Sequence, residues 1–392
     1  MSHGVITPTL PPEPTVVIMS QNPKRRRLNV TSDETCTTCL ICLDSGGIQK
    51  GCACRGANGV AHVACVAQHA QHNTNPRINV WYMCPTCRHL YTGRMLQELA
   101  VTWMEHTKNE EPTNRNRIGA MDNMAAAHRD KGEYKQALVI HRNLLPIEIA
   151  MRGENSQDVL ATLVNIAVCF KNMNRLKHAT FLFKRAAKGL AKTQGPRHTD
   201  TLTAISNLAS TYRLRGKYKH SRKLASSVYK ARLQKLGEAH PETLAAASAL
   251  ALTLLYNGEK SKSEKLDAQT VAIQTRVLGP DHPHTLTTTG NLAMTYLDMG
   301  NSDKAIELQE RVYRVSKRIH GTVHPVTLRV GGNLAVMFHT AGRVTEATDM
   351  QTKTVEDARC AHGNNHYEYE LARHTLEYIT AHPAKSTPCA DK

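Results

Sequence analysis

The pattern of hydrophobic and polar positions changes near residue 93. From there onward apolar residues recur every three to four positions over long segments, which is the period of an amphipathic α-helix. Before residue 93 the chain has a polar N-terminal stretch and then a cluster of cysteines. The pattern therefore predicts a mainly α-helical chain that begins with a small module of a different kind.

Two series of turn-forming residues divide the helical part into units of 42 residues. The first series is Gly153, Gly195, Gly237, Gly279, Gly321 and Gly363, and the second is Gly132, Asn174, Gly216, Gly258, Gly300 and Gly342. The second series would close the turn between two paired helices. The first would cap the second helix, because glycine accepts a left-handed conformation at low cost. Paired helices at a fixed period stack into an α-solenoid.

The strings NLASTYRLRGKY, LGEAHPETL and LGPDHPHTL resemble tetratricopeptide repeats (TPRs) of the kinesin light chain kind. The resemblance covers residues 112–380, as six repeats and a terminal cap helix, and it implies a TPR α-solenoid. The segment 93–111 aligns with the second helix of a repeat and is predicted as an N-terminal cap helix that mounts the preceding module. Its apolar face consists of Met95, Leu96, Leu99, Ala100, Trp103 and Met104.

Eight of the eleven cysteines fall between Cys36 and Cys87. In a reducing compartment such a cluster indicates zinc rather than disulfides. The available ligand pairs are Cys39 with Cys42, Cys52 with Cys54, His62 with Cys65, and Cys84 with Cys87. These ligands suffice for two closed tetrahedral sites, so two structural Zn²⁺ ions are predicted, which would supply the folding free energy of this short segment. An alternative stays open, because Cys36 and Cys39 also have the spacing of a ligand pair.

The ligand order and the string CRGANGVAHVAC resemble the RING-CH variant of the RING finger, over residues 36–91. PHD fingers share the order, but their tryptophan usually lies two residues before the last cysteine pair, whereas Trp81 lies three before Cys84. The RING resemblance implies interleaved pairs. One zinc would be held by Cys39, Cys42, His62 and Cys65, and the other by Cys52, Cys54, Cys84 and Cys87. His69 and His72 would lie on a helix outside both sites.

A RING finger has no catalytic residues of its own. The resemblance implies a RING-type ubiquitin ligase, which docks a ubiquitin-conjugating enzyme and acts by positioning its thioester-linked ubiquitin. The docking residues implied by the resemblance are Ile41, Trp81, Pro85 and Arg88. In the alternative, Ile41 and Trp81 only pack around the zinc loops, and the protein is a non-catalytic interaction scaffold. A PHD-like module would instead make it a chromatin reader.

Polar residues that share the 42-residue period are the candidate partner site. The TPR resemblance places Asn123, Asn165, Asn207, Asn291 and Asn333 on the concave surface, where side-chain amides can pair with the backbone of an extended peptide. Six positions after the first three asparagines lie the cations Arg129, Lys171 and Arg213, which would add positive charge to the groove. Histidines also recur, at positions 198, 240, 282, 324 and 366, and their fixed place after a helix cap predicts loop structure rather than a metal ladder.

The chain has 392 residues and a formal net charge of +17, most of it on the repeats. This charge predicts a protein partner with an acidic, extended segment. Nucleic acid is the rival partner, and the lack of aromatic residues interleaved with the cations disfavours it.

Residues 1–35 are rich in proline, threonine and serine and are predicted to be disordered, as are residues 381–392. Within the first tail, Lys24, Arg25, Arg26 and Arg27 resemble a monopartite nuclear import signal, with a solvated basic tail as the alternative. No apolar run is long enough to cross a bilayer. The protein is therefore expected to be intracellular, either cytoplasmic or nuclear, with no membrane partner.

Overall fold

The computed structural model describes residues 39, 41–42, 49–50, 60–73, 79–87, 90–364 and 367–382. In this part of the chain α-helices follow one another in pairs, and the only strands are two short ones near the start. The predicted fold class, a TPR-like α-solenoid with a small N-terminal module, is confirmed for the helical part. The chain divides into an N-terminal unit, Val16–Thr211, and a C-terminal unit that includes Tyr212–Lys392, and the boundary falls inside α7 (Thr199–Leu214).

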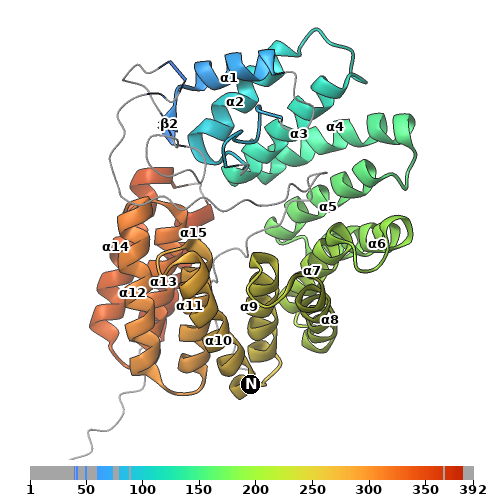
Figure 1. Ribbon diagram of the computed structural model, residues 1–392. Helices are drawn as coiled ribbons and strands as arrows, with labels where there is room; N and C mark the ends of the chain where they lie inside the picture. The colour runs from blue at the N-terminus through green and yellow to red at the C-terminus, as the bar shows by residue number, and fades with distance from the viewer. Residues whose placement is uncertain are drawn as a thin grey trace, which may run out of the picture. The chain divides into compact units, whose positions relative to one another are not determined.

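The N-terminal unit begins with the cysteine-rich segment and continues into the first helix pairs. Strands β1 (Gln49–Lys50) and β2 (Val60–Ala61) pair antiparallel, and α1 (Val63–His72) follows β2 directly. The helices after them are α2 (Gly93–His106), α3 (Arg115–Asp130), α4 (Tyr134–Arg152), α5 (Gln157–Asn172) and α6 (Leu176–Gln194). From α2 to α6, each helix packs on the next one along the chain (Figure 1).

The cysteine-rich segment and the first helices share one hydrophobic core. Its buried side chains include Cys39 and Val66 from the segment, Leu99 and Trp103 from α2, and Ala120 from α3. The apolar face predicted for residues 93–111 lies in this core. The segment is therefore packed on the first repeat and is not merely connected to it by the chain.

Two stacked tryptophans lie at the centre of this core. The rings of Trp81 and Trp103 have centroids 5.5 Å apart and planes 3° apart, and the residues are 6% and 1% exposed. Gly119 on α3 lies directly against the indole, because a Cβ added there would be 2.7 Å from Trp103 Cη2. Asn123, also on α3, donates through Nδ2 to the Trp81 carbonyl at 3.4 Å. This packing therefore joins the cysteine-rich segment, which contains Trp81, to helices α2 and α3.

The C-terminal unit continues the pairing of helices. Its elements after α7 are α8 (Tyr218–Leu236), α9 (Pro241–Tyr256), α10 (Lys260–Leu278), α11 (Pro283–Asp298), α12 (Ser302–His320), α13 (Pro325–Thr340), α14 (Val344–His362) and α15 (Tyr367–Ala381). Each of them packs on the next, and α15 also packs on α13 (Figure 1). Leu334 and Met337 of α13 are fully buried in the core that these helices share.

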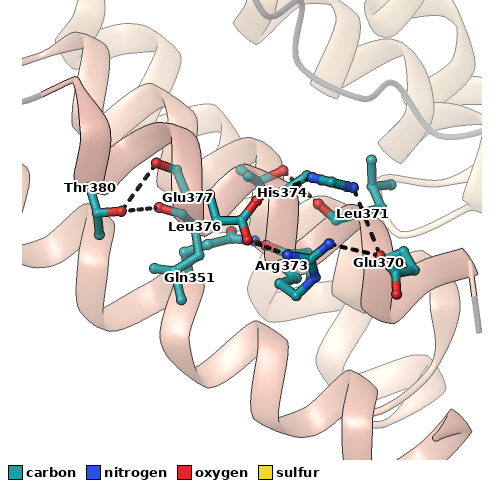
Figure 2. Close-up of polar contacts among 10 residues, drawn as sticks. Gln351, Glu370, Leu371, Arg373, His374, Leu376, Glu377 and Thr380 are labelled. Atoms are coloured by element: carbon teal, nitrogen blue, oxygen red, sulfur yellow. Dashed lines mark hydrogen bonds and ion pairs between the residues drawn. The ribbon is translucent and has the colours of Figure 1, made fainter. Parts of the chain in front are cut away.

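Helix α15 closes this unit with one apolar and one polar face. On the covered side, Gln351 of α14 donates through Nε2 to the Ala372 carbonyl at 2.8 Å. On the other side, Arg373 pairs with Glu370 at 3.1 Å and also with Glu377 (Figure 2). A face of charged residues such as this one is typical of a helix that caps a repeat array.

The glycines of the first series end the second helix of each pair. Gly279, for example, has φ +98° at the C-cap of α10, and its N–H donates to the Thr275 carbonyl at 3.1 Å. In the second series Asn174 adopts the same left-handed region, with φ +58°. Asparagine tolerates this conformation better than most other side chains do, which explains why it can replace glycine at this one position of the series.

The recurring histidines cap the first helix of each pair. In each case the histidine Nδ1 accepts the backbone N–H of the residue two positions later, at 3.2 or 3.3 Å. These histidines are His198, His240, His282 and His324. His366 lies outside the described residues. The expected structural role in the loop is confirmed for these four residues.

One repeat position carries a buried carboxyl group in α10, whereas the same position carries an amide in the next two repeats. In the next two repeats the position is Gln309 and Gln351, whose Nε2 atoms donate to carbonyls of the following helix at 3.1 Å and 2.8 Å. The counterpart in α10 is Asp267, which is 0% exposed, and neither of its oxygens has a hydrogen-bond partner in the described part of the chain. Burial raises the pKa of Asp267 well above its usual value.

We expect Asp267→Asn to stabilise the protein at pH 7 to 8, by about 1–3 kcal/mol, because it removes a buried carboxyl group that has no hydrogen-bond partner and whose pKa is raised by folding. The gain should vanish near pH 4. A carboxyl group whose pKa is raised by folding does not change the free energy of unfolding below its unfolded pKa, because both states are protonated there. As pH rises from the unfolded pKa toward the folded pKa, the folded protein becomes progressively less stable. Urea unfolding over a pH series tests this. The exposed Asp349→Asn is the control, and an unchanged pH profile for Asp267→Asn would contradict the prediction.

Candidate metal centre and partner surface

Four predicted zinc ligands form a cluster at the start of α1. The ligand atoms of Cys39, Cys42, His62 and Cys65 all lie within 4.8 Å of one another. His62 Nδ1 lies 3.3 Å from Cys42 Sγ and 3.7 Å from Cys65 Sγ. The backbone N–H groups of Ile41 and His62 both point at Cys39 Sγ, at 3.4 Å. Three thiols and an imidazole at these separations fit one tetrahedral metal ion of the kind that zinc forms in structural sites.

The chain order of these ligands is informative. Cys39 and Cys42 meet His62 and Cys65, although Cys52 and Cys54 lie between the two pairs in the sequence. A sequential arrangement would have joined the first pair to the second. The observed grouping is the interleaved one that the RING resemblance implies for the first site.

The other predicted metal ligands are described only in part. Cys84 is buried and Cys87 half-buried in the segment before α2. The partners predicted for them, Cys52 and Cys54, lie outside the described residues. So do Cys36, Arg88 and the basic run Lys24, Arg25, Arg26 and Arg27. Outside the cluster on α1, His69 and His72 are exposed, and His72 Nδ1 lies 2.8 Å from the Gln68 carbonyl oxygen.

The predicted docking residues have different environments. Ile41 is 45% exposed beside the metal ligands, and Pro85 is half-buried. Trp81, by contrast, lies in the core against Trp103. The sequence offered this packing role for Trp81 as an alternative to docking. The side chain of Trp81 therefore presents little surface to a partner.

The asparagines of the predicted groove are all buried, between 1% and 7% exposed. Asn291 donates through Nδ2 to Ser248 Oγ at 3.0 Å, as Asn123 donates to Trp81. The amides of Asn123 and Asn291 thus take part in packing between neighbouring parts of the chain. The sequence pattern specified which helix face they occupy, but it did not specify how deeply neighbouring side chains would cover them.

The predicted groove cations are covered as well. Lys171 and Arg213 are each 7% exposed, and the Arg213 guanidinium lies over the Tyr256 ring, 5.4 Å from its centroid. Arg129 Nη1 lies 3.4 Å from the Nε2 atom of His141, which is completely buried. The positive charges of Lys171 and Arg213 are therefore held within the helix packing, and Arg129 is half-buried.

The sequence pattern did not single out a group of ionisable residues in the first repeat, of which His141 and Glu148 are buried and Asp122 is partly exposed. His141 of α4 lies with Nδ1 3.7 Å from Asp122 Oδ1 of α3, and burial lowers the pKa of His141 to about 3. Burial raises the pKa of Asp122 to about 6 and that of Glu148 to about 7. Their signal in the sequence is a break in the repeat, because the residue aligned with His141 one repeat later is Phe183.

Comparisons with known proteins agree with the fold. Residues 242–317 and 288–359 match one tetratricopeptide-repeat family model, and residues 201–242 match a second. A search of curated proteins found no match to the chain. No helix in the described part of the chain is long and apolar enough to span a bilayer. Residues 201–359 therefore match tetratricopeptide repeats, and the helical part of the chain has the fold of a TPR-like α-solenoid.

Among solved structures, a TPR protein from Parabacteroides merdae has 15% identity and a TM-score of 0.50, covering 73% of this chain and 93% of that one. The quorum sensor NprR of B. thuringiensis, in complex with its cognate peptide NprX, has 13% identity and a TM-score of 0.50, covering 73% and 79%. A kinesin light chain candidate from Podosopora anserina with nearly identical TPR-like repeats has 24% identity and a TM-score of 0.45, covering 53% and 97%. The repeats of this chain are similar to these.

Proposed function

We propose that this protein is a zinc-binding adaptor, in which the TPRs bind a partner protein and the cysteine-rich module offers a second interaction surface. The observation that carries the proposal is the interleaved cluster of Cys39, Cys42, His62 and Cys65, packed into one core with the first repeat. A closed Cys₃His site holds no position for a substrate water, so its metal is structural. A second zinc would be held by Cys52, Cys54, Cys84 and Cys87.

More specifically, we propose that the protein acts as a RING-type ubiquitin ligase. Its support is the interleaved ligand grouping together with Ile41, which is exposed beside the metal cluster. Ile41, Pro85 and Arg88 would dock a ubiquitin-conjugating enzyme, and the repeats would hold the substrate protein near it. Rate enhancement would come from positioning the two proteins, since none of these residues acts on a bond.

The partner segment proposed for the repeats is acidic and extended. The net charge of +17 supports it, and the complex of NprR with a peptide is a precedent for peptide binding by this fold. Because the predicted groove residues are covered, binding would require side chains of the concave face to rearrange. A nuclear location would follow if the basic run at Lys24–Arg27 acts as an import signal.

An in vitro autoubiquitination assay across a broad panel of conjugating enzymes tests the ligase proposal. Ubiquitin chains should form with the unmodified protein, and Ile41→Ala should reduce them at least about tenfold while the zinc content stays unchanged, because Ile41 touches the docked enzyme and not the metal. Val101→Ala, at an exposed position of α2, is the matched control.

If no member of the panel supports chain formation, the non-catalytic scaffold becomes the better proposal. The burial of Trp81 already favours that alternative, because it removes one of the docking residues that the resemblance implied. A PHD-like chromatin reader would instead bind histone-tail peptides in the absence of any conjugating enzyme.

A further inference from the structure

One face of α6 is purely cationic. The helix carries five lysines and arginines and no acidic residue. They are Lys177, Lys184, Arg185, Lys188 and Lys192, and all are exposed. At 3.6 residues per turn, all of them lie within about 60° of Phe181 around the helix axis. Arg175 before the helix and Arg197 after it are exposed too and extend the face at both ends.

An aromatic ring lies in the middle of this face. Phe181 is 66% exposed, whereas Phe183, two positions later, is fully buried against neighbouring helices. The sequence alone shows two phenylalanines among the cations but not which of them points outward. Nucleic acid was disfavoured as a partner because the sequence pattern showed no aromatic residue interleaved with the cations, and Phe181 provides one.

We propose that this face binds single-stranded nucleic acid, with one base stacked on Phe181 and the cations contacting the phosphates on either side. Proteins that bind single strands without sequence preference combine these two elements, a cationic track and an exposed aromatic platform. Lys184, Lys188 and Lys192 follow one another at intervals of about 6 Å along the axis, which distributes charge along a strand instead of concentrating it at one phosphate.

Other anionic partners fit this face less well. An acidic peptide would be attracted by the same charge, as the ion pair of Arg185 with Glu154 at 3.2 Å illustrates. A peptide, however, has no need of an exposed aromatic ring such as that of Phe181. A duplex keeps its bases stacked inside, so Phe181 would have no base to contact. Four of the five cations on the helix are lysines, which suit a flexible phosphate backbone because an ammonium group imposes no fixed geometry. The sequence pI of about 9.5 is in the range typical of nucleic-acid binding.

The test measures binding of the full-length protein to fluorescein-labelled oligo(dT) of about twelve nucleotides, by fluorescence anisotropy. The affinity should fall with salt, with a slope near −3 on a log–log plot if four phosphates are contacted. The charge reversal Lys177→Glu, Lys184→Glu and Lys188→Glu should weaken binding at least about tenfold. Phe181→Ala should weaken it by about fivefold to a hundredfold, because it removes a stacked base.

The next repeat supplies the matched control. Lys219, Lys223 and Lys230 lie on the corresponding face of α8, also exposed, with a lysine in place of Phe181. Reversing these three charges alters net charge equally and should leave binding within about twofold. All variants keep the basic N-terminal run, so differences among them report on the helices, and unchanged zinc content and helicity would show that the variants are folded.

Three results would overturn the proposal. The first is an equal loss in the α6 and α8 variants, which would indicate general charge attraction. The second is duplex DNA of the same length binding as tightly as the single strand. The third is binding of a poly-glutamate peptide while oligo(dT) does not bind, which would assign the face to an acidic protein. These outcomes do not depend on ligase activity, since the assay contains no ubiquitin-conjugating enzyme.

Discussion

Replacing His62 by alanine unfolds the cysteine-rich module and leaves the helices of the repeats largely intact: this is the largest effect we expect from any single substitution. The ring nitrogen of His62 lies within 3.7 Å of two thiols of the cluster, so its loss removes one of four ligands from the site. Structural zinc sites in small modules contribute on the order of 10 kcal/mol of folding free energy. A segment this short has little else to replace that contribution.

The measurement is elemental analysis of the purified protein together with far-UV circular dichroism. Two zinc ions per chain are expected in the unmodified protein, one or fewer in His62→Ala, and two in the control His69→Ala, whose side chain is exposed on α1 outside the cluster. Helicity should fall only slightly in His62→Ala, because most helices belong to the repeats. Purified protein without zinc, or His62→Ala with full zinc content, would refute the metal centre.

Trp103→Ala should destabilise the N-terminal unit by about 3–5 kcal/mol, because it empties the centre of the core that joins the module to the first repeat. The side chain is 1% exposed, stacks on the Trp81 ring and lies against Gly119. The cavity would be bounded by the cysteine-rich segment, α2 and α3. A shift of only one of these elements would not fill it.

Urea unfolding and limited proteolysis test this second prediction. Val101→Ala on the same helix is the control, because Val101 is 58% exposed and its truncation should cost less than about 0.5 kcal/mol. Gly119→Ala should also destabilise the protein, since its added Cβ would lie 2.7 Å from Cη2 of the Trp103 indole. Trp103→Ala behaving like Val101→Ala would show that the module and the repeat fold independently.

The helical architecture could be predicted from the sequence because its signals are local and repeated. Gly279 ends a helix for reasons contained in its own backbone conformation, and His282 caps the next helix through an atom only two residues from its partner. Such contacts are fixed by short stretches of chain. The 42-residue period then indicates that every repeat uses them in the same way.

The candidate sites were less predictable, because exposure depends on residues distant in the sequence. The period places Asn291 on a helix face, but Ser248 of the preceding repeat decides that its amide is covered. The spacing of Trp81 from the cysteines matches a docking residue, yet its environment is set by Trp103. Asp267 occupies a position that is Ala225 one repeat earlier and Gln309 one repeat later, and its lack of a donor partner appears only in three dimensions.

The stacked tryptophans have a further consequence, for spectroscopy. The chain contains only these two tryptophans, and both lie in the core between the cysteine-rich module and the first repeat. Indole emission, selectively excited, therefore originates from one junction in a protein of 392 residues, and the other repeats contribute tyrosines alone. The two tryptophans are therefore an intrinsic fluorescence probe of the junction between the cysteine-rich module and the first repeat. Emission and far-UV dichroism, followed in the same titration, would report separately on the detachment of the module and on the melting of the repeats.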